Sequence, residues 1–145
     1  SFLKYGEGRS SLATRRIDLV RAVTEGVAHN LAWLLPHVET FTGQPIEDLA
    51  FVGGAARSPQ WCQILADVCD RSFERVADPL IAGLRGCALF FGLATGAVRR
   101  EEVRDLVPVD RTFAPDPGTR AAYDRLFREF PKLHARNKAM FSHLN

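Results

Sequence analysis

The chain has 145 residues, 46% of them hydrophobic and 25% charged, which is typical of one soluble globular domain and excludes disordered, collagen-like and coiled-coil proteins. Its formal charge of +2 is too small to indicate a nucleic-acid or anionic-membrane partner. The three cysteines, Cys62, Cys69 and Cys87, lack C-x-x-C spacing, which predicts reduced, unpaired and metal-free thiols in a reducing cytoplasm.

The N-terminal residues and the longest apolar run indicate neither secretion nor membrane insertion. The first sixteen residues carry four basic side chains and no continuous apolar segment, so we expect no signal peptide. The apolar run over 87–98 is shorter than the roughly 20 residues that a membrane span needs. Because the chain begins with Ser1 rather than Met, we expect it to be a piece of a longer protein.

Apolar residues at steps of three and four predict an amphipathic helix over 15–35. The residues of this stripe are Ile17, Val20, Val23, Val27, Leu31, Leu34 and Leu35. The stripe continues beyond Pro36, which predicts a kinked helix that ends only at Gly43. Arg21 and Glu25 lie four residues apart, a spacing that predicts a surface salt bridge.

A strand, a glycine turn and a helix are predicted next. The apolar residues 49–52 indicate a buried strand, and Gly53-Gly54 follow it directly. Ser58 before a proline has the chemistry of a helix N-cap, so a helix is expected over 61–68. A second strand over 73–76 should pair in parallel with the first if the connection is a right-handed crossover.

The remaining chain predicts helices and one linker. Asp78-Pro79 should open a helix whose apolar body over 84–94 is buried on most sides and which ends at Gly96. A short polar helix over 99–106 should follow, and Pro108, Pro115 and Pro117 then mark a linker. The last helix is expected from Thr119, with a kink at Pro131.

The segment over 53–58 has the strongest potential for chemistry. A strand followed by glycines and a helix start presents free backbone N–H groups, which suit a phosphate. The sequence matches neither the P-loop nor the dinucleotide-binding glycine pattern. On local pattern alone, a tight turn between a strand and a helix is the simpler interpretation.

Other polar residues receive structural interpretations. The histidines lack the spacing of metal ligands, so no metal site is predicted. Basic residues near the C-terminus indicate the solvated face of a helix. These residues are His29, His37, His134 and His143, and Lys132, Arg136 and Lys138.

Five motifs together resemble the C-terminal domain of the FGGY carbohydrate kinases, most closely the xylulokinases. Residues 21–28 resemble R-A-x-x-E-G-[IV]-A, 51–58 resemble the G-G-[GA]-x-x-S nucleotide loop, 61–68 resemble W-x-Q-[IM]-x-A-D-[VI], 83–89 resemble G-x-x-G-A-A-L, and 113–117 with Tyr123 resemble the closing F-x-P and Y segment. The resemblance implies an α/β, actin-like ATPase (ribonuclease H-like) fold, here as a helix-rich fragment.

The resemblance also implies a chemistry. Family members transfer the γ-phosphoryl group of ATP to a sugar or polyol hydroxyl with Mg²⁺. Gly54 and Ser58 would contact the nucleotide, with Gly53 and Ala55 shaping the loop. Residues 1–145 would be the C-terminal portion of the nucleotide-binding domain, with the sugar-binding N-terminal domain and the catalytic aspartate outside this sequence. The chain is therefore expected to hold no catalytic residue and to be inactive alone.

Two classes of function follow from this resemblance. The first is the nucleotide side of an ATP-dependent kinase for a ketopentose such as D-xylulose, with glycerol, gluconate and ribulose kinases as alternatives. The second is a non-catalytic actin-like scaffold. ATP and a sugar are the expected ligands, with no nucleic acid or membrane as a partner. An uncovered sheet edge would favour self-association, including a homodimer.

Overall fold

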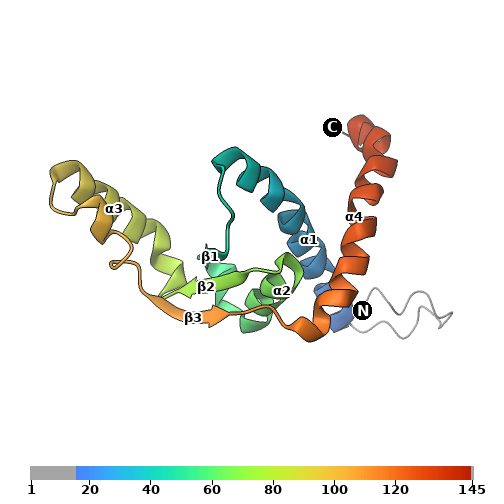
Figure 1. Ribbon diagram of the computed structural model, residues 1–145, viewed down its shortest axis with the longest axis horizontal. Coiled ribbons are helices and arrows are strands. Elements are labelled where there is room, and N and C mark those ends of the chain that lie inside the picture. The colour runs from blue at the N-terminus through green and yellow to red at the C-terminus, as the bar shows by residue number, and fades with distance from the viewer. Residues whose placement is uncertain (1–15, 145) are drawn as a thin grey trace.

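Three short strands form one mixed sheet in the computed structural model, which describes residues 16–144 (Figure 1). Strand β1 (Asp48–Phe51) pairs in parallel with β2 (Ser72–Val76), and β3 (Val109–Phe113) pairs antiparallel with β2. The order β1-β2-β3 leaves β1 and β3 at the two edges. The predicted parallel pairing of the first two strands is confirmed.

Strand β3 shows that the predicted linker over 108–117 was wrong. Only Phe113 of this strand is buried, and the four residues before it are exposed. The segment therefore lacks the alternation of apolar and polar residues by which a half-buried strand is recognised. It is a strand because its backbone completes the free edge of β2, with Phe113 opposite Phe73.

Four α-helices accompany the sheet in the described residues. They are α1 (Arg16–Thr42), α2 (Pro59–Cys69), α3 (Ala82–Thr95) and α4 (Pro117–Leu144). Helix α2 packs on the sheet, and α1 and α4 pack on α2 (Figure 1). Pro36 and Pro131 lie inside α1 and α4, so the predicted continuation of both helices through a proline is confirmed.

The core lies where α2 meets the sheet and the two long helices. Its buried members include Leu65 and Ala66 of α2, Ala28 of α1, Phe73 of β2 and Tyr123 of α4. Helix α2 is therefore covered on most sides, and it fixes the sheet relative to α1 and α4. The first residues of α2 follow directly from the glycine loop, so the core also holds that loop.

The cysteines separate into two buried thiols and one exposed thiol. Burial raises the pKa of Cys69 to about 12 and also raises the pKa of Cys62, whereas Cys87 on α3 is exposed. Because the thiolate is the reactive form, we expect a thiol reagent to label Cys87 under native conditions and the other two only after unfolding. Mass spectrometry of the labelled chain measures this. Labelling of Cys69 at the rate of Cys87 would contradict it.

The apolar stripe predicted for α1 does not coincide with the buried face of the helix. Glu25, Ala28, His29 and Leu35 are buried. Most of the predicted stripe is exposed, namely Ile17, Val20, Val23, Val27 and Leu34. Apolar residues cover a wider arc of α1 than α2 and α4 can contact, so periodicity identified the helix but not the side that is packed.

The prediction that the apolar helix is buried on most sides was wrong for this chain. Helix α3 projects away from the other helices (Figure 1), and Gly92 is its one buried residue. Leu84, Phe90 and Phe91 are 72%, 74% and 69% exposed. The helix ends at Gly96 in the left-handed conformation, as predicted.

The polar helix predicted over 99–106 is shorter in the structure. It consists of one 3₁₀ turn, Arg100–Glu102, followed by turn residues. Arg99 and Glu102 bond to one another around this turn. Such a local pair satisfies the backbone without a longer helix.

A buried carboxylate joins α1 to α4. Glu25 is 4% exposed, accepts a 2.7 Å hydrogen bond from Arg21 Nε and accepts another of 3.1 Å from the Tyr123 hydroxyl. Arg21 Nη2 also donates to that hydroxyl at 3.3 Å. The predicted Arg21–Glu25 pair exists, but the prediction that it is a surface salt bridge was wrong, because α4 covers the carboxylate.

His29 lies beside this carboxylate, between α1 and α4. It is 5% exposed, neither ring nitrogen has a hydrogen-bond partner within residues 16–144, and its ring lies near those of Tyr123 and Phe127. Burial lowers the His29 pKa, Glu25 opposes this shift, and the positive charge of Arg120 on α4 adds to it.

We therefore expect acid to destabilise the chain through His29. With its pKa lowered on folding, the unfolded chain binds more protons near pH 6.5, so the free energy of unfolding falls as pH drops below about 6.5. Urea unfolding at several pH values measures this fall. His29→Leu should reduce the fall in the free energy of unfolding at acid pH, and His37→Gln on the exposed part of α1 should not. An unchanged fall in His29→Leu would contradict the prediction.

Two expectations concern the ends of the chain. The predicted lack of a signal peptide and the helix start at Arg15 involve residues before Arg16, which lie outside the described residues. From residue 16 to residue 144, no helix combines the length and the apolar character needed to cross a bilayer.

Candidate functional site

The loop after β1 has a backbone that requires glycine at one position. Gly53 has φ +88°, and its N–H donates a 2.8 Å hydrogen bond to the carbonyl of Pro79. Residues other than glycine rarely adopt this backbone conformation. The chain then enters the 3₁₀ turn η3 (Gly54–Arg57), which leads into α2. Gly53 therefore sets the path of the loop backbone.

Gly54 faces open space. An added Cβ would meet only Leu80 Cδ2, at 4.0 Å, and the backbone φ is not in the left-handed region. The first bond of the turn runs from Ala56 N–H to the Gly53 carbonyl at 3.2 Å, so this bond uses neither the Gly54 nor the Ala55 N–H. The folded chain does not require a glycine at 54, and the two N–H groups can serve a ligand.

Ser58 caps helix α2. Its hydroxyl accepts a 3.3 Å hydrogen bond from the backbone N–H of Trp61, and Pro59 occupies the first helical position. This is the N-cap that the sequence predicted. The hydroxyl lies at the edge of the loop, where it can also meet a ligand.

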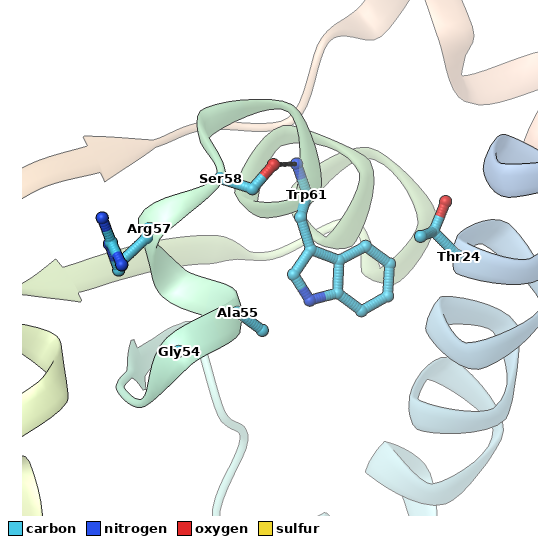
Figure 2. Close-up of a pocket in the computed structure, with 6 residues that line it drawn as sticks. All are labelled: Thr24, Gly54, Ala55, Arg57, Ser58 and Trp61. Atoms are coloured by element: carbon cyan, nitrogen blue, oxygen red, sulfur yellow. Dashed lines mark hydrogen bonds between the residues drawn. The ribbon is translucent and has the colours of Figure 1, made fainter. Parts of the chain in front are cut away.

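These loop residues line an open hollow of about 530 Å³ (Figure 2). Gly54, Ala55, Arg57 and Ser58 belong to the loop, Trp61 to the first turn of α2, and Thr24 to α1. The hollow lies beyond the carboxyl end of β1, the edge at which open α/β sheets bind ligands. Its lining combines backbone N–H groups, two hydroxyls, one guanidinium and one indole.

The predicted site residues are brought together only in part. Gly54, Ala55 and Ser58 line the hollow. Gly53 does not line it, and its N–H instead bonds to the Pro79 carbonyl. Sequence reasoning missed Thr24, Arg57 and Trp61. Thr24 and Trp61 lie inside the motifs of 21–28 and 61–68, but an isolated motif does not show that two helices face one hollow.

The other motif residues hold this region in place. Gln63 Nε2 donates to the Ala114 carbonyl at 2.8 Å, and Asp67 Oδ1 accepts from Gln63 Nε2 at 2.8 Å and from the Asp116 N–H at 2.9 Å. Asp67 is 8% exposed. These bonds tie α2 to the segment between β3 and α4. In this chain, Gln63 and Asp67 of the motif over 61–68 therefore hold two segments together and do not face the hollow.

The lining suits a nucleotide better than a metal ion. Backbone N–H groups and a guanidinium attract phosphate oxygens, and the bare Gly54 allows close approach. None of the six lining residues is a carboxylate, the ligand that Mg²⁺ prefers. Elsewhere in residues 16–144, no group of three or more His, Cys, Asp or Glu side chains could hold a metal ion.

Comparison with known families gives one match to a family model. The model of the C-terminal domain of the FGGY family of carbohydrate kinases matches residues 9–95. This range contains α1, the loop, α2, β2 and α3. Strand β3 and helix α4 lie beyond it.

Individual relatives are kinases of several kinds. The chain is 33% identical over 122 residues to an autoinducer-2 kinase of Enterobacter sp. (strain 638), covering 83% of this chain and 23% of the relative. It is 34% identical over 107 residues to a glycerol kinase of Haemophilus influenzae, covering 73% and 21%. The chain thus spans less than a quarter of these relatives.

A solved structure supports the fold over nearly the whole chain. The xylulose kinase of Rhodospirillum rubrum superposes with a TM-score of 0.76 at 30% identity, covering 93% of this chain and 27% of that one. The similarity includes most of the region beyond the family model. The predicted actin-like ATPase fold is confirmed.

Proposed function

Because the chain belongs to the FGGY family of carbohydrate kinases, we propose that it forms the nucleotide side of an ATP-dependent sugar kinase. The observation that supports this most directly is the open Gly54 at the carboxyl end of β1, with no packing contact that would require a glycine. In the proposed complex, the N–H groups of Gly54 and Ala55 donate to the nucleotide. Ser58 closes the loop, and Gly53 sets its shape.

The proposed reaction is transfer of the γ-phosphoryl group of ATP to a sugar hydroxyl. Mg²⁺, when bound, would neutralise charge that develops on the phosphates. The lining of the hollow supplies no carboxylate for it, so the metal ligands, the general base and the sugar-binding residues are assigned to the rest of the kinase. This chain would bind and orient ATP, and we expect no sugar kinase activity from it alone.

We propose a ketopentose such as D-xylulose as the acceptor, in a cytoplasmic enzyme. The structural similarity to xylulose kinase favours this class, and the glycerol and autoinducer-2 kinases among the relatives define the alternatives. The relevant test is the whole gene product that carries this chain, assayed with ATP, Mg²⁺ and each of D-xylulose, ribulose, glycerol and gluconate. A preference for glycerol or gluconate would overturn the ketopentose proposal.

A non-catalytic scaffold is the second candidate. The exposed apolar residues of α1 and α3 favour it, because such surfaces bind other proteins or other copies of the chain. A scaffold does not need a loop that binds a nucleotide, whereas a kinase does. Whether the loop supports ATP-dependent activity therefore separates the two candidates.

A chimeric kinase tests the proposal. Residues 1–145 would replace the matching C-terminal part of the Rhodospirillum rubrum xylulose kinase, and ATP-dependent phosphorylation of D-xylulose would be measured. We expect activity in the chimera and its loss in a Gly54→Val chimera. A soluble, folded chimera without activity, beside an active parent, would favour the scaffold.

A further inference from the structure

Two arginines lie opposite one another on strands β2 and β3. Arg75 of β2 and Arg111 of β3 are partners in the register of this antiparallel pair. The side chains of such partners lie on the same face of the sheet, and like charges in this position repel one another. The sheet therefore keeps two positive charges side by side at a cost in stability.

A single carboxylate neutralises one of the two arginines. Asp110 has no partner on β2, because the pairing shifts between Arg75 and Val76, and an irregularity of this kind redirects a side chain. Asp110 Oδ1 accepts a 2.7 Å hydrogen bond from Arg75 Nε. Within residues 16–144, the side chain of Arg111 has neither an ion pair nor a hydrogen bond. One positive charge is therefore left without a counter-charge in this part of the chain.

Both guanidinium groups lie near one aromatic ring. The Cζ atom of Arg111 is 4.7 Å from the centroid of the Phe113 ring, and the Cζ atom of Arg75 is 6.0 Å from it. Phe113 is buried in the core, so its ring provides a fixed surface against which the two cations can lie. The folded chain therefore holds the two guanidinium groups close together before a ligand binds.

The first turn of α2 lies beside the two arginines. Burial raises the pKa of the Cys62 thiol in this turn, and the positive charges of Arg75 and Arg111 oppose that rise. The N-terminal end of a helix carries a partial positive charge of its own. The surplus positive charge of the two strands is thus added to that of the helix, and the surface between them favours an anion.

The free hydrogen-bond donors of the two arginines suit a phosphate group. Asp110 uses Nε of Arg75, which leaves the terminal amino groups of that side chain, and Arg111 keeps its whole set of N–H donors. A carboxylate has two oxygens and satisfies one guanidinium fork, whereas a phosphate group has three strong acceptor oxygens and nearly two negative charges. A phosphate can therefore bond to both arginines at once and offset their repulsion.

We propose that Arg75 and Arg111 bind the phosphate group of a small molecule, either inorganic phosphate or a sugar phosphate, at the surface beside the first turn of α2. Each guanidinium donates to a different oxygen of the phosphate. Neither arginine lines the hollow at the glycine loop, so the Arg75–Arg111 site is separate from it. The inference does not depend on the proposed nucleotide role of the loop.

Titration of the 145-residue chain with phosphate compounds tests the site. The probes are inorganic phosphate and ribose 5-phosphate at about pH 7.5, where both are mainly dianions, with NaCl used to keep the ionic strength constant. NMR follows the Nε–H signals of Arg75 and Arg111. We expect both signals to shift saturably, with a Kd of about 1–10 mM.

The two probes distinguish the sources of the phosphate group. Tighter binding of ribose 5-phosphate supports the site and identifies a sugar phosphate as its ligand, whereas equal affinities support it with the free ion as the ligand. Shifts of the two Nε–H signals that NaCl alone reproduces at the same ionic strength would overturn the site.

Variants at three positions separate binding from folding. Arg111→Gln should weaken phosphate binding by about tenfold or more, and Arg111→Lys by at least about threefold, because an ammonium group lacks the planar fork. Arg125→Gln is the matched control, since Arg125 is exposed on α4 and has no ion pair within residues 16–144. Gly54→Val should also leave the Arg75 shift unchanged, and loss of the shift in that variant would assign the phosphate to the glycine loop instead.

Asp110→Asn is expected to strengthen phosphate binding. The asparagine keeps the size of the side chain and removes the charge that competes with phosphate for Arg75, so we expect binding to be about threefold tighter or more. Damage to the fold would have the opposite effect, and circular dichroism verifies that each variant is folded. Unchanged or weaker binding in folded Asp110→Asn, or unchanged binding in folded Arg111→Gln, overturns the proposal.

Discussion

Replacing Gly54 by valine is expected to raise the KM for ATP by about tenfold or more in a kinase that contains this chain, and to leave the KM for the sugar nearly unchanged. The added side chain meets no neighbour closer than 4.0 Å in the chain itself. It would instead occupy open space beside the loop, where we propose that the nucleotide binds. Steady-state kinetics with each substrate varied in turn measure the two constants.

Gly83→Val is the matched control. Gly83, at the start of α3, also has nothing within 4 Å of an added Cβ and lies outside the hollow. It introduces the same side chain without touching the proposed nucleotide site, so both KM values should stay close to the parent. Equal loss for ATP and sugar in Gly54→Val would indicate misfolding and count against a local nucleotide role.

Tyr123→Phe is expected to lower the free energy of unfolding by about 1–3 kcal/mol, the usual cost of depriving a buried polar group of a partner. The buried Glu25 carboxylate loses the hydroxyl that donates to it at 3.1 Å, and the phenylalanine ring preserves the packing between α1 and α4. Urea unfolding followed by circular dichroism measures the change.

A surface pair provides the comparison. Lys132 and Glu129 form an exposed ion pair on the same helix, α4, and Lys132→Met should leave the urea midpoint where it is, because solvent already screens these charges. Glu25→Gln combined with Tyr123→Phe should cost less than the sum of the two single changes, since both act on one network. A Tyr123→Phe midpoint equal to that of the parent would show that the hydroxyl contributes nothing.

Local chemistry predicted the central part of the fold well. The run over 49–52, the glycines after it and the Ser58-Pro59 pair each restrict the backbone, and together they specified strand, loop and helix without reference to distant residues. β3 was missed because its formation depends on an edge offered by β2. A pairing partner elsewhere in the chain leaves no pattern in a five-residue segment whose first four residues are exposed.

The site was predictable only along the chain. Gly53, Gly54, Ala55 and Ser58 are consecutive or nearly so, and one motif identifies them. Thr24 lies 30 residues before Gly54 in the sequence, and it reaches the hollow because α1 packs on α2. The burial of Glu25 also depends on contacts between helices. The four-residue spacing within α1 predicts its pairing with Arg21, but it does not show that Tyr123 of α4 lies over the pair.

The projecting position of α3 has a consequence for how the chain opens. Its main contacts are with the 3₁₀ turn of residues 79–81 directly before it, whereas α2 contacts two other helices and the sheet. The hydrogen bonds of α3 can therefore break without disturbing the core. In native-state hydrogen exchange its amides should exchange through local opening and be largely insensitive to low urea, while those of α2 exchange only on global unfolding. We therefore expect two cooperative units, with the Gly53–Pro79 hydrogen bond joining the glycine loop to the less stable one.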